Sequence, residues 1–269
     1  MSVGSVEVGG LALAYEESGE GTAVVFVHGT ATDRSLWRET IEALGGSHRA
    51  IVYDRRAYGG SGAPEPYGGT TVEEQAEDAA ALMRALGAAP AVLCGHGLGA
   101  VVCLDVVRRH PALVRGAVLI EPPLHSLSAG GAEAMGALRE QIERGARDDG
   151  SAGAVDGFLL ETAGAKALER LGPARVAAAR AAARAFAADL AAAPSWEFGR
   201  RELRRVELPL IVICGRLSAP LWREIAAELD SLLPSARLEL IAAGHLGPVE
   251  APREVVAAIN DLSPSRATA

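Results

Sequence analysis

The stretch Cys94-Gly95-His96-Gly97-Leu98-Gly99-Ala100 joins two segments of different character. Residues 91–94 form an apolar run that is typical of a buried strand, whereas residues 98–109 show the spacing of a helix. Glycines concentrated between a strand and a helix allow the backbone to bend sharply and to approach a neighbouring segment or a ligand. This turn therefore predicts an alternating strand and helix architecture and marks one place where a functional site is expected.

The same alternation extends in both directions along the chain. It starts with an antiparallel hairpin around Gly9-Gly10. Further strands are predicted at residues 23–27, 49–53, 116–121, 210–214 and 237–241, and helices at residues 35–44, 70–87, 220–233 and 252–262. Strands and helices in this order predict an α/β fold with a mostly parallel sheet that is covered on both faces.

The alternation stops between residues 122 and 205, where Ala, Arg, Glu and Leu dominate and no strand pattern is visible. A helix is predicted at residues 173–192, with Pro173 in its first turn. We expect residues 122–205 to form a helical lid inserted into a core made of residues 1–121 and 206–264. Residues 265–269 are expected to be a flexible tail.

Composition limits the classes of partner. The 269 residues include 26 basic and 34 acidic side chains, a net charge of −8 that disfavours nucleic acid and anionic membranes. Three cysteines without a C-x-x-C pair argue against a disulfide framework or a thiolate metal site. No signal sequence or membrane span is visible, so the expectation is a cytoplasmic protein without metal or cofactor.

The turn resembles the G-x-S-x-G elbow of the α/β-hydrolase family, with Gly95 and Gly99 in register. In that family the central residue is the nucleophile, and here it is Gly97. The resemblance thus implies an α/β-hydrolase fold with a helical lid, and at the same time an elbow without its serine.

A second part of the family pattern is His28-Gly29-Thr30, after the strand at residues 23–27. The resemblance implies an oxyanion hole formed by the backbone N–H groups of Thr30 and Leu98. It also places Gly29 and His96 next to the substrate, although His28 and His96 equally suit a structural role. Residues 54–61 resemble a loop of the family in which Ala57 replaces a usual glycine.

His245, after the last predicted strand, stands where the family keeps its base. The loop at residues 215–220, where many relatives carry the acid, contains Ser218 and no carboxylate. Glu121, at the end of another strand, is a candidate partner that would orient the imidazole of His245. Alternatively, Glu121 is a carboxylate at the lid hinge, paired with an arginine or a backbone N–H group.

Glycine has no side-chain oxygen, so no acyl-enzyme can form on Gly97. The preferred hypothesis is an enzyme in which His245 and the oxyanion hole act noncovalently on a small, apolar carbonyl compound by elimination, aldol-type cleavage, cyclisation or direct hydrolysis. Two alternatives stay open: an ester or lactone hydrolase inactivated by Ser→Gly at position 97, and a non-catalytic binder of small ligands.

A hypothesis of another class uses the same turn. Gly95, Gly97 and Ala100 also fit G-x-G-x-x-A, and Glu121 follows at the end of the next strand, as in dinucleotide-binding proteins. Such a motif usually opens its sheet, whereas two strand-helix units precede this one. It also assigns no role to His245.

Overall fold

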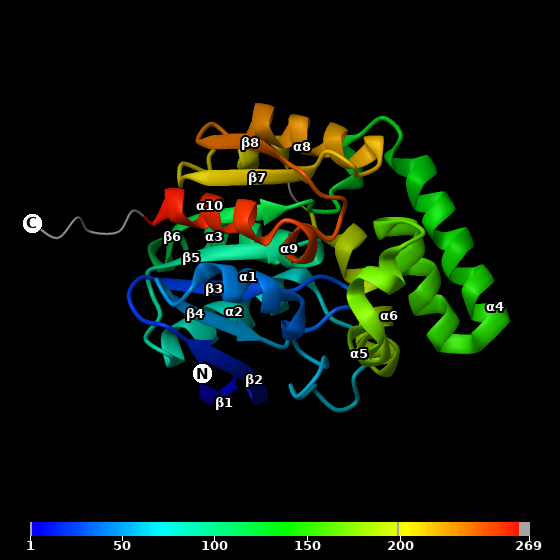
Figure 1. Ribbon diagram of the computed structural model, residues 1–269, viewed down its shortest axis with the longest axis horizontal. Helices are drawn as coiled ribbons and strands as arrows, with labels where there is room; N and C mark the ends of the chain where they lie inside the picture. The colour runs from blue at the N-terminus through cyan, green and yellow to red at the C-terminus, as the bar shows by residue number, and fades with distance from the viewer. Residues whose placement is uncertain (1, 198, 264–269) are drawn as a thin grey trace, which may run out of the picture.

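The computed structural model describes residues 2–197 and 199–263, which form one eight-stranded sheet flanked by helices (Figure 1). The strand order is β1-β2-β4-β3-β5-β6-β7-β8. The strands are β1 Ser2–Val8, β2 Leu11–Ser18, β3 Ala23–Val27, β4 Arg49–Tyr53, β5 Ala91–His96, β6 Val114–Ile120, β7 Leu210–Gly215 and β8 Ala236–Ile241. From β4 to β8 all pairings are parallel, and the β1–β2 hairpin adds antiparallel strands at one edge.

The central strands are apolar because the sheet is covered on both faces. Every residue of β3, β5 and β7 is buried, and Val, Ile and Leu dominate these strands. Helices α2 Val72–Ala85, α3 Leu98–Arg109 and α8 Pro220–Leu232 pack on one face. Helices α1 Arg38–Leu44 and α10 Pro252–Leu262 pack on the other (Figure 1). The predicted mostly parallel α/β fold is confirmed.

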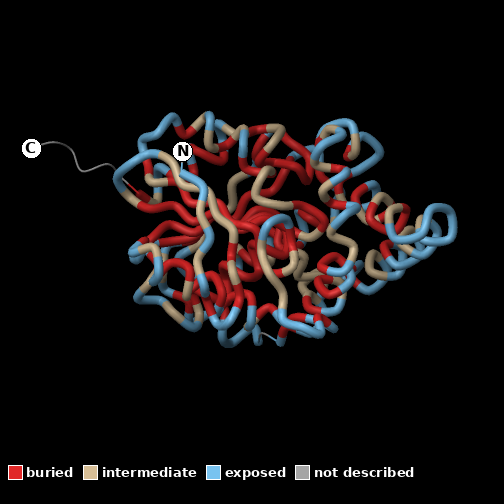
Figure 2. Tube along the Cα trace, turned by 90° about the horizontal axis from the view of Figure 1, so that it is seen from below, coloured by how far each residue is buried: buried red, intermediate tan, exposed pale blue. Residues whose placement is uncertain are grey.

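A long helical segment, residues 122–205, connects β6 to β7. Its helices are η3 His125–Leu127, α4 Gly131–Ala163, α5 Ala167–Ala181, α6 Ala183–Ser195 and α7 Arg200–Leu203. Helices α4, α5 and α6 lie beyond one end of the sheet, with α4 outermost (Figure 1). The outer part of the segment is largely exposed, while the central strands of the sheet are buried (Figure 2). The segment therefore lies over the loops that follow β3, β5 and β8.

One predicted helix differs from the structure. The helix expected at residues 173–192 is broken at Ala182, which separates α5 from α6. Neither glycine nor proline marks this break. After the break, Phe186 of α6 packs against Phe158 of α4 with ring centroids 5.3 Å apart. The predicted tail at residues 265–269 lies outside the described residues.

Short elements complete the chain: η1 Arg34–Trp37, η2 Pro111–Leu113 and α9 Gly247–Glu250. Thr71 and Glu74 form a capping box at the start of α2. Among the residues that the structure describes, no helix combines the length and apolar composition needed to cross a bilayer.

Candidate active site

The turn at Gly97 joins β5 to α3 with a backbone that favours glycine, at φ +54° and ψ −125°. A Cβ atom at Gly99 would overlap the carbonyl oxygens of Val27 and His28. At Gly97 the space is open, since a Cβ atom there would meet only the Gly29 Cα atom, at 3.8 Å. Close packing thus requires glycine at Gly99, whereas at Gly97 only the backbone conformation favours it.

Two backbone N–H groups near this turn are available to a ligand. Within the described part of the chain, no protein acceptor bonds the N–H of Thr30 or that of Leu98. Leu98 is the first residue of α3, where helical N–H groups lack partners and the helix dipole favours negative charge. Both residues line one cavity with Gly29 and Gly97. This arrangement suits the developing negative charge on a carbonyl oxygen.

The structure brings His245 and Glu121 together. Nδ1 of His245 donates to Oε2 of Glu121 at 2.6 Å. The other carboxylate oxygen accepts hydrogen bonds from the backbone N–H of Gly215, at 2.8 Å, and from the hydroxyl of Ser218, at 2.5 Å. Burial opposes the ionisation of Glu121, but its bonds with His245, Ser218 and Gly215 hold its pKa below the ordinary value. Glu121 also has a positive φ of 45°, which these bonds help to maintain.

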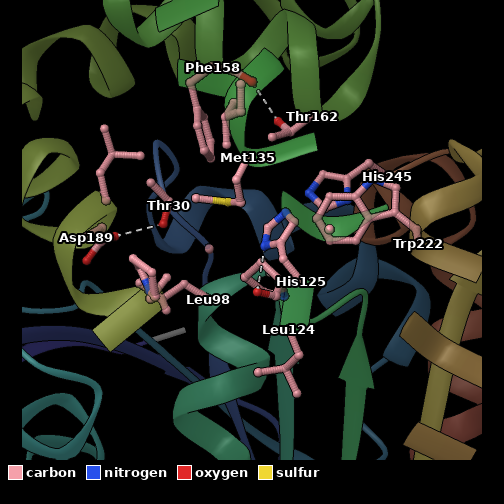
Figure 3. A pocket seen from close by; sticks show the side chains of 18 of the residues that line it. Thr30, Leu98, Leu124, His125, Met135, Phe158, Thr162, Asp189, Trp222 and His245 are labelled. Carbon is pink, nitrogen blue, oxygen red and sulfur yellow. Dashed lines mark hydrogen bonds between the residues drawn. The ribbon is translucent and has the colours of Figure 1, made fainter. Parts of the chain in front are cut away.

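This bond determines the tautomer of His245. Because Nδ1 carries the proton, Nε2 is an acceptor, and the ring lines the cavity (Figure 3). The indole of Trp222 stacks on the imidazole with centroids 4.5 Å apart and planes at 28°. The orientation of the ring is therefore held by Glu121 at one edge and by Trp222 on a face.

The other two predicted histidines are tied to the backbone. Nε2 of His96 donates to the carbonyl oxygen of His245 at 2.8 Å, and burial lowers the pKa of His96 to about 3. His28 donates through Nδ1 to Gly29 and accepts the Arg55 N–H at Nε2, and burial holds its pKa well below the ordinary value. His96 and Gly29 line the cavity, whereas His28 supports the loop behind it.

A cavity of about 430 Å³ lies between these loops and the helical segment. The helical segment supplies most of its apolar wall, including Leu124, Met135, Leu138, Phe158, Leu190 and Trp196. Among the described lining residues there is no lysine or arginine. The lining thus suits an uncharged, largely apolar molecule of modest size.

Sequence reasoning did not identify Asp189, a buried carboxylate of the helical segment. It forms an ion pair with Arg55 at 2.7 Å and accepts hydrogen bonds from Tyr58, Gln75 and Thr30. Both carboxylate oxygens are therefore occupied by donors of the protein. Asp189 ties α6 to the core loop that carries Thr30.

Two more cavity residues, His125 and Trp222, also escaped the sequence reasoning. Trp222 lies on α8 and His125 in η3, and neither forms part of a local motif. The one available signal for His125 was its position four residues after Glu121, at the start of the helical segment.

Comparisons with known proteins agree with this architecture. Residues 24–259 match the model of the alpha/beta hydrolase family. A thermophilic esterase from Thermogutta terrifontis superposes with a TM-score of 0.78 at 26% identity and covers 97% of both chains. A hydrolase from Pseudomonas aeruginosa superposes with a TM-score of 0.81 at 24% identity and 98% coverage of both chains, which supports the fold alone.

Among curated proteins, the 2-(acetamidomethylene)succinate hydrolase of Mesorhizobium japonicum is 30% identical over 156 residues, 57% of this chain and 53% of that protein. The uncharacterized hydrolase YraK of Bacillus subtilis is 31% identical over 127 residues, 47% of each chain. The chain thus spans about half the length of the curated relatives that it matches. With the match over residues 24–259 and the eight-stranded sheet, the chain belongs to the α/β-hydrolase family.

Proposed function

We propose that the protein is an enzyme that acts on a small, neutral, largely apolar carbonyl compound without a covalent intermediate. The observation that carries this proposal is the combination of a paired His245 and Glu121 with two open backbone N–H groups, around a Gly97 that has no side chain. The groups that would stabilise negative charge and transfer a proton are present, and a side-chain nucleophile at position 97 is absent.

In the proposed reaction the substrate carbonyl oxygen accepts hydrogen bonds from the N–H groups of Thr30 and Leu98. Nε2 of His245 removes a proton from one of two sources. The source is either a position on the substrate close to the carbonyl group or a water molecule. The electron pair released then forms an enolate, breaks a neighbouring bond, or attacks the carbonyl carbon as hydroxide, with negative charge developing on the carbonyl oxygen. Glu121 stabilises the imidazolium until the proton is returned to the product.

The open space at Gly97 supports this mechanism. A serine side chain would occupy the volume in front of the elbow, where a Cβ atom meets only Gly29 Cα at 3.8 Å. Without it, a water molecule or a bulkier substrate atom fits between His245 and the two N–H groups. Elimination, aldol-type cleavage, cyclisation and direct hydrolysis all need this space and no acyl-enzyme.

The cavity favours a substrate unlike that named for one relative. The enzyme from Mesorhizobium japonicum is named for hydrolysis of a succinate derivative, a dicarboxylate. Here the described lining has no lysine or arginine to pair with a carboxylate. We therefore propose a neutral substrate for this chain.

A second candidate is an ester or lactone hydrolase inactivated by Ser→Gly at position 97. Relatives described as a hydrolase and an esterase favour it. A non-catalytic binder would use the same cavity without turnover. The dinucleotide alternative is disfavoured because Glu121 is occupied by His245, Ser218 and Gly215 rather than open to a ribose.

The test is Gly97→Ser, with turnover measured on a panel of neutral esters, lactones, hydroxy ketones and diketones. A noncovalent enzyme turns over at least one compound as the native chain, and loses that activity in both Gly97→Ser and His245→Ala. An inactivated hydrolase is inert as the native chain and gains esterase activity and fluorophosphonate labelling in Gly97→Ser. A binder shows no turnover in either form. The outcome expected for an inactivated hydrolase and the outcome expected for a binder each contradict the proposal.

A further inference from the structure

His125 is a second imidazole on the cavity wall. It is the first residue of η3 and is separated by Leu124 from the Pro122-Pro123 pair after β6. Its Nδ1 atom is 2.9 Å from the carbonyl oxygen of Pro123, which can only accept, so Nδ1 carries the proton. The ring projects into the cavity beside Met135 (Figure 3).

The remaining nitrogen of His125 is available to a ligand. In the described residues, no group donates to Nε2. Burial lowers the pKa of His125 and so keeps the ring neutral near pH 7. A neutral imidazole whose Nδ1 is a donor presents Nε2 as an acceptor.

The other polar side chains of the cavity are largely satisfied within the protein. Four lining hydroxyl groups donate to protein acceptors: Thr30 to Asp189, Thr32 to the Gly29 carbonyl, Thr162 to the Phe158 carbonyl and Ser128 to Glu224. Asp189 is itself occupied by Arg55, Tyr58 and Gln75. The imidazole nitrogens left unpaired at the cavity in the described structure are Nε2 of His245, Nε2 of His125 and Nδ1 of His96. Nδ1 of His96 is buried against Gly29, so the two Nε2 atoms are the imidazole acceptors open to a ligand.

We propose that Nε2 of His125 accepts a hydrogen bond from a hydroxyl or N–H group of the substrate. The substrate class is then a neutral carbonyl compound that carries a hydrogen-bond donor apart from its reacting carbonyl group. This inference rests on the proposed function, because the carbonyl group is placed by the N–H groups of Thr30 and Leu98.

The two imidazoles are close enough to serve one small molecule. The Trp222 ring stacks on His245 at 4.5 Å and lies 6.0 Å from His125, measured between ring centroids. One indole thus contacts both rings, within a cavity of about 430 Å³. A carboxylate would meet an acceptor at His125 rather than a donor, so the site selects donors and disfavours anions.

The experiment measures binding by calorimetry for acetophenone, the three hydroxyacetophenone isomers and the matched methoxyacetophenones. At least one hydroxy isomer is expected to bind about threefold to tenfold more tightly than its methoxy partner, the effect of one neutral hydrogen bond. In His125→Phe, which keeps a ring of similar size, the ratio falls to about one while the affinity for acetophenone stays within about twofold. In His245→Gln the ratio is retained, because the donor is bound elsewhere.

Three results would overturn the inference: no hydroxy isomer is preferred, the preference survives in His125→Phe, or it disappears in His245→Gln alone. A ¹⁵N spectrum of the ligand-free imidazoles supplies an independent readout, in which Nε2 of His125 is expected to be unprotonated, and a proton there also overturns it. Because binding needs no turnover, these results are separate from those for the proposed function. A protein that turns nothing over but shows the His125-dependent preference loses the proposed function and keeps the donor site.

Discussion

Glu121, which is bonded to the cavity residue His245, and Asp189, which lines the cavity itself, are both buried carboxylates with different kinds of partner. Each is about 1% exposed. Glu121 belongs to the core and binds a histidine whose second nitrogen faces the cavity. Asp189 belongs to the helical segment and binds Arg55, which is not one of the residues that line the cavity. We therefore expect a catalytic role for Glu121, whose partner has a nitrogen open to the cavity, and a structural role for Asp189, whose partner does not line the cavity.

The largest expected effect is on turnover, in Glu121→Gln. The Gly215 N–H and the Ser218 hydroxyl donate to the other carboxylate oxygen, so they hold the amide oxygen there and turn the amide N–H group toward Nδ1 of His245. N–H then meets N–H unless the imidazole changes tautomer, and the other tautomer has no free base at Nε2. We expect kcat on the substrate identified with the native chain to fall by about 10³-fold to 10⁴-fold, the size seen when a triad carboxylate becomes an amide.

The matched control is Glu254→Gln, since Glu254 caps the backbone N–H of Ala242 at the surface. Its kcat should stay within about threefold of native. If Glu121→Gln retains native kcat, the orienting role assigned to Glu121 is wrong.

The next effect is on stability, in Asp189→Asn. The substitution leaves the Arg55 guanidinium buried without its counter-ion, and breaking a buried pair in this way costs about 3–5 kcal/mol. The free energy of unfolding, from urea titration, should fall by that amount. The kcat of the folded variant should fall by less than about tenfold, because no proton passes through Asp189.

Asp156→Asn, in the same helical segment, removes a partly exposed pair with Arg180 and should change the unfolding free energy by less than about 1 kcal/mol. A variant Asp189→Asn that is stable but inactive would reverse the comparison and give Asp189 a role in chemistry.

Much of the core side of the cavity was predictable from local sequence. Strand runs and glycine turns place Glu121 and His245 just after predicted parallel strands, whose carboxyl ends lie at one edge of a sheet. In the structure these strands are β6 and β8, with β7 between them. Asp189 and His125 were not predictable in this way. Asp189 and His125 line the cavity because of the way the helical segment packs on the core. The alanine-rich composition of this segment does not indicate which of its polar residues faces the cavity.

A smaller effect is expected on acidification. His96 has a pKa of about 3 in the folded protein because it is buried, and about 6.5 in the unfolded chain. Below about pH 6.5 the unfolded state binds more protons, so stability falls as the pH decreases from 6.5 toward 3. At about pH 5 the loss due to His96 amounts to about 2 kcal/mol.

His96→Gln should remove that part of the pH dependence, since the glutamine amide can still donate to the His245 carbonyl and cannot be protonated. The measurement is the unfolding free energy at about pH 7.5 and about pH 5 for both proteins. Equal pH dependence in the two proteins would show that His96 does not titrate on unfolding.

The smallest effect concerns the loop that carries Arg55. Ala57 has a φ of +65°, a conformation that L-residues with a Cβ atom adopt at a cost of about 1–2 kcal/mol. Its N–H donates to the Gly62 carbonyl at 2.9 Å, so the loop holds the residue in this conformation. Ala57→Gly should therefore raise the unfolding free energy by about 1 kcal/mol. The same change at Ala81, inside α2, should lower it by about 1 kcal/mol because glycine is the poorer helix former. If Ala57→Gly is instead destabilising, the Ala57 methyl group contributes packing that outweighs the backbone cost. The Arg55–Asp189 connection would then depend on this side chain as well as on the charge pair.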